Sequence, residues 1–276
     1  MRSGNLLAFA LCAGLLLSTT GCAKLQSRDQ MNQGVQAYKN NKYADAVQHF
    51  KEAVRLDPTN RNAQLFLATS YMIQWVPGVD SPDNKKNYDM AKAEFNKVLQ
   101  EDPNNSLALE SLASMAYNSA QGTGADMAQK MKYLEEAAKW NERRIEVDPK
   151  NAGAYYYLGV IDWTKAIAPI QTARVDEKEK PEDQGPLKDA KVRDDLKAKY
   201  EKDIDTGLED LKKSLQYDPE NEDAMTYVNL LYREKAALAD SPQEAQEYLS
   251  KANEWFNKSL EMKRIKASRP AKKTET

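Results

Sequence analysis

The sequence has 276 residues, and its 40 Lys and Arg residues nearly balance its 42 Asp and Glu residues. A general nucleic-acid binder carries a basic excess, so this balance argues against that class. The 11 glycines and 8% aromatic residues argue against a β-sandwich or barrel. A mean hydropathy of -0.78 is low for one compact core and favours a thin array of helices, each with a solvated face.

The N-terminus has the form of an export signal. Arg2 supplies a positive start, and an apolar run follows from Leu6 to Leu17. This run is too short for a comfortable membrane span but has the usual length for a signal segment. We therefore expect residues 1–21 to be a signal peptide that is removed.

Gly21 and Cys22 resemble the cleavage box of bacterial lipoproteins, with Thr19 where Leu is usual. The resemblance implies that Cys22 becomes the N-terminus of the mature chain and carries acyl chains such as palmitate; stable anchoring needs more than one chain. Ala23 after the Cys implies the outer rather than the inner membrane. The alternative is an ordinary secretory signal cut near Cys22 or Ala23, which would leave a soluble protein.

A repeated Asp-Pro pair divides the rest of the chain. Each pair follows an apolar, helix-patterned segment, and an Asn comes one or two residues later. The residue before a proline is biased away from helix, so each pair predicts the end of a helix. The four pairs are Asp57-Pro58, Asp102-Pro103, Asp148-Pro149 and Asp218-Pro219.

The segment before the first pair predicts a helical hairpin. Small residues at Gly34, Ala46 and Ala53 let two helices approach closely, and Phe50 fills the space between them. This pattern resembles the tetratricopeptide repeat, which is a helix–turn–helix unit. Polar Gln33 stands where that family has Leu, as expected for a first repeat with a polar outer face.

The pattern recurs along the chain, with the weakest match at Asn141 and Arg144, where an aromatic and a small residue are usual. The resemblance implies an all-α, right-handed α-solenoid of about five such hairpins. The expected organisation is a signal peptide at 1–21, a tether at 22–29, units at 30–59, 61–104, 106–150, 152–220 and 222–262, and a basic disordered tail at 263–276.

The spacing of the repeated prolines predicts insertions. The family period is 34 residues, whereas Pro58, Pro103, Pro149 and Pro219 are 45, 46 and 70 residues apart. We expect the excess to lie between the helices of each hairpin. The largest insertion is 168–186, and its core, 176–186, is charged and poor in apolar residues, so we expect this core to be mobile. Apolar residues at spacings of three and four then predict one long amphipathic helix from Val192 to Leu215.

No catalytic constellation is visible in the sequence. The one His, His49, has no Cys or second His nearby and cannot build a metal site. Gly122 and Gly124 lack the residues of a phosphate-binding loop, and no Ser has a His partner. We predict a protein that is not an enzyme and needs no cofactor or metal.

The remaining function is binding. In the tetratricopeptide family the first helix of each unit lines a concave face. The helical positions that face this concave surface in the family imply a set of partner-binding residues in this sequence. They are Tyr38, Lys39, Asn62, Met72, Tyr117, Asn118, Tyr156, Trp163 and Arg233, with Met31, Val35, Leu65, Thr69, Glu110, Ser114, Val160, Thr226 and Leu230 in the same phase. The alternative for any one of them is packing against the next repeat.

The function implied is a protein–protein interaction scaffold or assembly factor of the bacterial cell envelope. It would be lipid-anchored, facing the periplasm, and would bind an envelope protein rather than nucleic acid. The alternative is a periplasmic protein that binds a glycan or small ligand through the Tyr-rich face. The basic tail from Lys263 could touch anionic lipid, although a solubilising end is the simpler interpretation.

Overall fold

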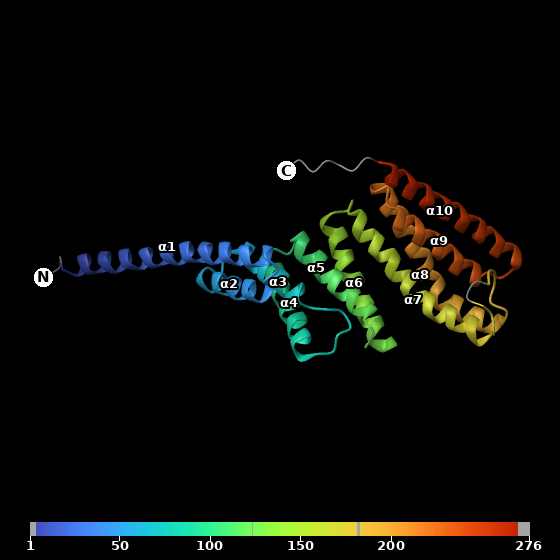
Figure 1. The fold of residues 1–276 in the computed structure, drawn as a ribbon, viewed down its shortest axis with the longest axis horizontal. Coiled ribbons are helices and arrows are strands. Elements are labelled where there is room, and N and C mark those ends of the chain that lie inside the picture. Colours follow the sequence, from blue (N-terminus) through green and yellow to red (C-terminus); the bar gives the residue numbers. More distant parts are fainter. Residues whose placement is uncertain (1–3, 123, 181–182, 270–276) are drawn as a thin grey trace. The chain divides into compact units, whose positions relative to one another are not determined.

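The computed structural model of the chain describes residues 4–122, 124–180 and 183–269, with side chains from Cys22 onward (Figure 1). These residues form α-helices and no strands, so the all-α prediction is confirmed. The helices are α1 (Gly4–Lys39), α2 (Tyr43–Leu56), α3 (Arg61–Met72), α4 (Pro82–Glu101), α5 (Ser106–Gln121), α6 (Met127–Val147), α7 (Ala152–Asp176), α8 (Ala190–Tyr217), α9 (Glu222–Ala237) and α10 (Pro242–Ser268).

The chain divides into two compact units, Met1–Asp126 and Met127–Thr276. In unit 1 each of the helices α1 to α5 packs against the next, and in unit 2 the same holds for α6 to α10. The division falls between α5 and α6, inside the segment 106–150 that the sequence assigns to one repeat. Each unit is therefore a stack of antiparallel helices in its own right.

Each Asp-Pro-x-Asn segment ends one helix and begins the next. Asp57, Asp102 and Asp218 are the C-terminal caps of α2, α4 and α8. The Asn that follows accepts a hydrogen bond from the backbone N–H three residues later, at 2.9–3.1 Å. Such caps contribute about 1 kcal/mol each. The capping residues are Asn60, Asn105, Asn151 and Asn221, at the starts of the first helices α3, α5, α7 and α9.

Glycines set the close approach of helices in both units. A Cβ atom at Gly34 of α1 would lie 2.6 Å from the ring of Phe50, so Phe50 of α2 packs directly on the α1 backbone. In unit 2 a Cβ atom at Gly159 of α7 would lie 2.8 Å from the carbonyl oxygen of Gly207 on α8. Real Cβ atoms do not approach this closely, so α7 and α8 meet backbone to backbone at this point.

The described residues of the insertion 168–186 make specific contacts within unit 2, and residues 181–182 of its expected mobile core lie outside the described residues. Helix α7 continues to Asp176. Buried Arg174 then donates to Glu179 Oε2 and to the carbonyl oxygen of Gly185, both at 2.6 Å. Leu187 is fully buried, and its backbone N–H donates to the carbonyl oxygen of Ala237 at 2.9 Å. Glu179 is thus paired with Arg174 and lies 3.6 Å from the Lys188 ammonium, so the buried charge in this loop is paired.

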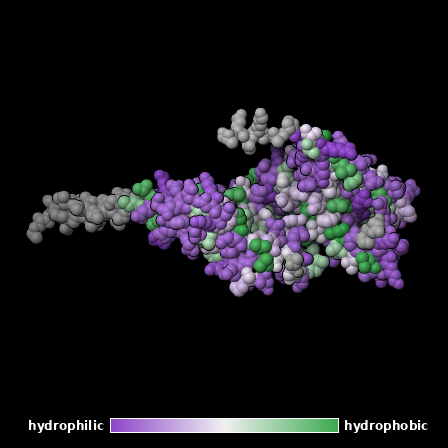
Figure 2. Space-filling view, viewed as in Figure 1, coloured by the Kyte–Doolittle hydropathy of each residue, from purple (hydrophilic) through white to green (hydrophobic). Residues whose placement is uncertain are grey.

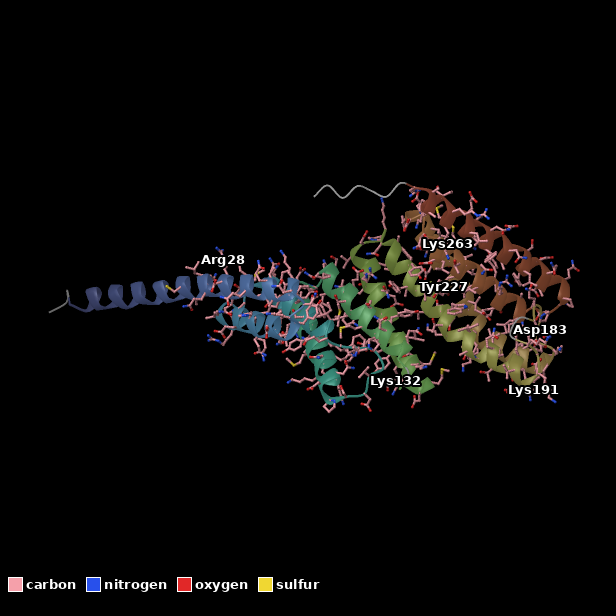
Figure 3. All side chains as sticks on the ribbon, in the orientation of Figure 1. Arg28, Lys132, Asp183, Lys191, Tyr227 and Lys263 are labelled. Carbon is pink, nitrogen blue, oxygen red and sulfur yellow. The ribbon has the colours of Figure 1, made fainter. Side chains whose placement is uncertain are left out.

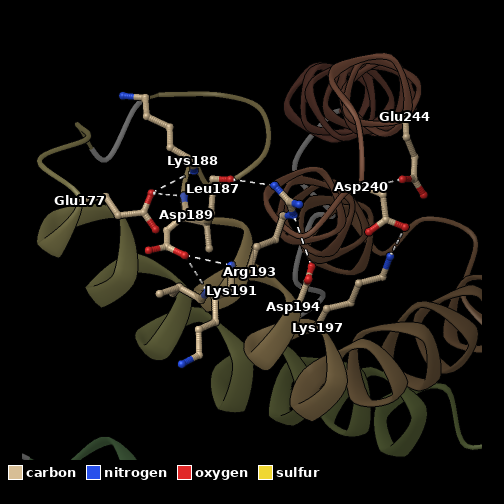
Figure 4. A network of polar contacts seen from close by, with 11 residues as sticks. Glu177, Leu187, Lys188, Asp189, Lys191, Arg193, Asp194, Lys197, Asp240 and Glu244 are labelled. Atoms are coloured by element: carbon tan, nitrogen blue, oxygen red, sulfur yellow. Dashed lines mark hydrogen bonds and ion pairs between the residues drawn. The ribbon is translucent and has the colours of Figure 1, made fainter.

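The end of this loop is joined to α8 (Figure 4). Glu177 Oε2 accepts from the backbone N–H groups of Lys188 and Asp189, at 2.9 and 3.2 Å. Asp189 in turn caps the start of α8, and Arg193 Nη1 donates to the carbonyl oxygen of Leu187. The prediction of one long amphipathic helix is confirmed, since α8 includes the whole stretch from Val192 to Leu215.

The visible surface is largely hydrophilic, with separate hydrophobic patches (Figure 2). Within the described residues, no helix has a stretch that is both long and apolar enough to span a bilayer. Helix α1 runs without a break from Gly4 to Lys39, so it includes most of the expected signal segment and the expected tether. Cys22 is exposed on this helix.

Candidate partner-binding site

Three aromatic side chains meet on the first helices of unit 2. Trp163 of α7 lies edge-to-face with Tyr227 of α9, with ring centroids 5.3 Å apart, and Tyr156 of α7 lies edge-to-face with Tyr227 at 5.9 Å. Each of the three is half-buried, with its inner edge on the core of the unit. We call Tyr156, Trp163 and Tyr227 the aromatic cluster; Figure 3 shows Tyr227 in the middle of unit 2.

The helical period explains why these rings converge. Tyr156 and Trp163 are seven residues apart, so they lie on the same face of α7 two turns apart. Helix α9 packs against α7 and places Tyr227 in contact with both rings. Burial raises the pKa of Tyr227, with smaller contributions from Asp223 and Tyr157, so its hydroxyl stays protonated near neutral pH.

A buried carboxyl group lies close to the cluster. Glu234 of α9 is 4% exposed, and burial raises its pKa to about 7. The guanidinium of Arg174, the neighbouring Trp163 indole and the guanidinium of Arg233 all oppose this rise. Glu234 is therefore a side chain whose charge changes near neutral pH beside the aromatic cluster.

Arg233 is tied to its neighbours. Its Nε donates to Asn229 Oδ1 at 3.0 Å, and its Nη2 donates to Asn253 Oδ1 of α10 at 3.2 Å. Of the residues predicted from the sequence in this unit, the structure thus brings Tyr156 and Trp163 together through Tyr227. Arg233 instead connects α9 to α10.

Unit 1 carries the other predicted residues. Tyr38 of α1 lies edge-to-face with Tyr43 and with Phe66 of α3, with centroids 5.2 and 6.4 Å apart. Lys39 and Asn62 are exposed. Met72, Tyr117 and Asn118 are half-buried, and Asn118 donates to Ser114 Oγ at 3.3 Å.

One residue of the predicted concave phase is misplaced, and two residues of the site were missed. Val160 is 1% exposed and belongs to the core, because it follows Gly159 at the close approach of α7 to α8. The predicted phase contains Thr226, whereas the structure brings its neighbour Tyr227 to the two rings of α7. Glu234 carries no sequence signal, because a Glu on a helix is usually solvated. An aromatic residue two turns after the Asn221 cap was the available signal for Tyr227.

The described residues contain no group of three His, Cys, Asp or Glu side chains that could hold a metal ion. His49 is half-buried, with Nδ1 2.9 Å from Gln30 Oε1 of α1.

An open hollow of about 380 Å³ lies beside α7 and α8, and its mainly apolar lining includes Pro169, Val192 and Leu196. The aromatic cluster can make apolar and aromatic contacts, and the titratable carboxyl group of Glu234 lies beside it.

The carboxyl group gives a pH prediction for stability. Because the pKa of Glu234 is raised from 4.5 to about 7 in the folded state, the folded chain binds more protons than the unfolded chain between these values. The free energy of unfolding of unit 2 is therefore expected to fall as pH rises from about 4.5 to 7, by at most about 3 kcal/mol from this group.

Urea unfolding of the wild type and Glu234→Gln across this pH range measures the effect. Asp210, whose pKa burial raises to about 6, and Asp162, whose pKa burial also raises, contribute falls of the same sign that the variant retains. The variant should lose most of the remaining slope. Superimposable pH profiles for the two proteins would show that Glu234 does not titrate as the geometry requires.

These features define a class, an α-solenoid of tetratricopeptide-like helical hairpins. A family model described as plant specific mitochondrial import receptor subunit TOM20 matches residues 29–133. No curated protein matches the chain. The matched part lies mostly in unit 1 and covers less than half of the sequence.

Solved structures give the fold more completely. A crystal structure of MamA protein superposes with a TM-score of 0.56 and 17% identity, over 88% of this chain and 94% of that chain. MamA residues 41 to the end from Desulfovibrio magneticus RS-1 give 0.54 and 16%, over 88% and 98%. A thermophilic TPR protein from Thermus thermophilus gives 0.42 and 16%, over 88% and 97%. The MamA structures confirm the α-solenoid prediction at the level of fold.

Proposed function

We propose that this chain is a non-catalytic scaffold that binds a protein partner through the aromatic cluster of unit 2. The observation that carries the proposal is the convergence of three half-buried rings from two neighbouring first helices. Tyr and Trp are over-represented among the residues that dominate protein interfaces, since they supply large contact area at low entropic cost. An apolar segment of a partner fits this chemistry.

The surroundings of the cluster favour binding over catalysis. Burial raises the pKa of Tyr227, so its hydroxyl is not the ionised nucleophile that covalent catalysis needs near neutral pH. Arg233, the neighbouring cation, has its guanidinium engaged by Asn229 and Asn253. A preformed, partly apolar surface with fixed polar neighbours suits recognition of another chain.

The test compares two sets of variants. Changing Tyr156, Trp163 and Tyr227 together to Ala should weaken partner binding more than tenfold, because each ring contributes roughly 1 kcal/mol or more at such a contact. Tyr217→Ala is the matched control, since Tyr217 is exposed on α8 and lies outside the cluster. Affinity is measured for the protein captured by crosslinking in the native cell.

Retention of every association in the triple variant, with circular dichroism unchanged, would contradict the proposal. The alternative function, recognition of a glycan or small ligand by the same rings, predicts a different pattern. Cell-wall fragments would raise the melting temperature of the wild type but not of the triple variant, and no protein would be captured.

The proposed location is the periplasmic side of the bacterial outer membrane, with acyl chains on Cys22. Support comes from the Gly21-Cys22 pair after a short apolar run, from Ala23 after it, and from the exposure of Cys22. Two or more acyl chains give stable anchoring, whereas one gives marginal binding.

The prediction for Cys22→Ser is loss of the anchor. The variant chain should move from the membrane fraction to the soluble fraction of lysed cells, because no other lipid attachment is proposed. Labelling with a radioactive fatty acid gives an independent readout, expected in the wild type only. An unlabelled wild type, or a variant that stays with membranes, would refute lipid anchoring at this residue.

A further inference from the structure

The last helix exposes an apolar residue at a position that the other second helices bury. In each second helix a buried Ala or Gly is followed, four residues later, by a residue at an equivalent position of the repeat. Four of these residues are 0–1% exposed: Phe50, Phe95, Asn141 and Leu211. In α10 the equivalent residue, four after buried Ala252, is Phe256, which is 43% exposed.

The difference follows from what packs next. Helix α2 is covered by α3, and Phe66 of α3 stacks on Phe50 with ring centroids 5.3 Å apart. Helices α6 and α8 are covered in the same way by α7 and α9. Helix α10 ends at Ser268, and the described residues provide no further helix to cover it. Phe256 therefore marks the place that the first helix of a following hairpin would occupy.

The open face of α10 has a defined chemistry. Phe256 and Leu260 are both exposed and lie one turn apart. Their other exposed neighbours at helical spacings of three, four and seven residues include no acidic side chain: Asn253, Asn257, Lys263, Arg264 and Ala267. We call Phe256, Leu260, Lys263 and Arg264 the α10 seam; Figure 3 labels Lys263 on this helix.

A second copy of this chain is a poor occupant. Phe66 and Leu67 of α3 pack toward the preceding hairpin, and the residues one 34-residue period earlier, on α1, are Asn32 and Gln33. Both are exposed and polar. Burying these amides against Phe256 would cost free energy without offering hydrogen bonds. Head-to-tail growth of the solenoid is therefore disfavoured.

The charges at the end of α10 indicate which kind of helix would pack on it. The start of α9 lies beside the end of α10, where Lys266 pairs with Glu222 and Arg269 with Glu220. An incoming antiparallel helix would likewise place its first turn near Lys263 and Arg264. Lys263 lies near Glu222, and Arg264 pairs with exposed Glu261 at 3.8 Å. Acidic side chains in the incoming turn would add to these contacts and would also favour the helix dipole.

We propose that the α10 seam binds an amphipathic helix of a partner protein, with apolar side chains on Phe256 and Leu260 and acidic residues in its first turn. This surface extends the scaffold function proposed above and is separate from the aromatic cluster. Binding is by helix-on-helix packing, the same contact that joins α9 to α8 within this chain.

The test uses a defined probe. A hydrocarbon-stapled peptide of residues 222–237, the helix that covers α8, carries Glu222 and Asp223 in its first turn. Titrated into the full chain and followed by fluorescence anisotropy, it should bind with a Kd of about 10–100 μM. The double variant Phe256→Asn/Leu260→Asn should bind it at least tenfold more weakly.

Controls separate the seam from other surfaces. Ile265→Asn removes a similarly exposed apolar residue from the opposite side of α10 and should leave the affinity unchanged. A peptide with Lys at both acidic positions should bind more weakly than the parent. The triple aromatic-cluster variant should bind the peptide normally, so failure here is distinguishable from failure of the proposed function. Equal binding by the seam variant, no binding at 1 mM peptide, or dimerisation of the chain through Phe256 would overturn the proposal.

Discussion

Replacing Arg174 with Leu is expected to lower the free energy of unfolding of unit 2 by about 3–5 kcal/mol. Arg174 and Glu179 are both buried, and their side chains form an ion pair at 2.6 Å. The variant leaves the Glu179 carboxylate buried with only the exposed Lys188 ammonium 3.6 Å away. It also removes the bond to the carbonyl oxygen of Gly185. An uncompensated buried charge is among the most destabilising single changes.

A double-variant cycle tests the cause. Arg174→Leu/Glu179→Leu removes both charges and should recover a large part of the loss, because a buried pair replaced by apolar groups is often neutral. Glu146→Ala, which breaks the exposed pair with Arg143, should change stability by less than about 1 kcal/mol. Urea unfolding followed by Trp140, Trp163 and Trp255, all in unit 2, provides the measurement. A loss below about 1 kcal/mol for Arg174→Leu would mean that the loop is not held by this pair.

Gly159→Val is expected to destabilise unit 2 by about 3 kcal/mol, at the upper end of the usual cost of overpacking. A Cβ atom at this position would meet the side chain of Leu211 and would lie 2.8 Å from the carbonyl oxygen of Gly207. The Leu211 side chain can rotate, but the α8 backbone can move only if the whole helix shifts. The change therefore separates the two helices that form the centre of the unit.

Gly153→Ala is the matched control in the same helix. A Cβ atom there has its nearest neighbours at 3.6 Å, an ordinary van der Waals distance. Removing a glycine from a helix without a clash stabilises by about 0.4–1 kcal/mol, through the lower entropy of the unfolded chain. Thermal unfolding should thus move in opposite directions for the two variants. A fall in melting temperature of similar size for both would argue against the backbone contact.

The positions of the helices were predictable because their ends are set locally. Asp57 and Asn60 fix one boundary through cap hydrogen bonds within a few residues, and the same chemistry recurs at later boundaries. The close packing of Phe50 on Gly34 was predictable for the same reason, since small residues at repeat spacing have few alternatives. The all-α class and the long α8 helix followed from these patterns.

The site was less predictable because it depends on contacts between helices. Trp163 lies in the predicted phase, but its partner Tyr227 lies one residue outside it. A helix turns 100° per residue, so a rotation of α9 by about half that angle decides which of two neighbours faces α7. The packed loop also depends on long-range contacts, since the Leu187 N–H donates to the carbonyl oxygen of Ala237 at the end of α9. Composition alone favoured a mobile segment there.

We propose above that the aromatic cluster is a protein-binding surface. A photoreactive phenylalanine derivative at position 227, in the full chain in the native cell, tests it most directly, with the same derivative at Tyr217 as control. We expect covalent capture of one protein from position 227, none of it from position 217, and its loss when Trp163 is also changed to Ala. Equal capture from both positions, or none from position 227, would show that the cluster is not a binding surface.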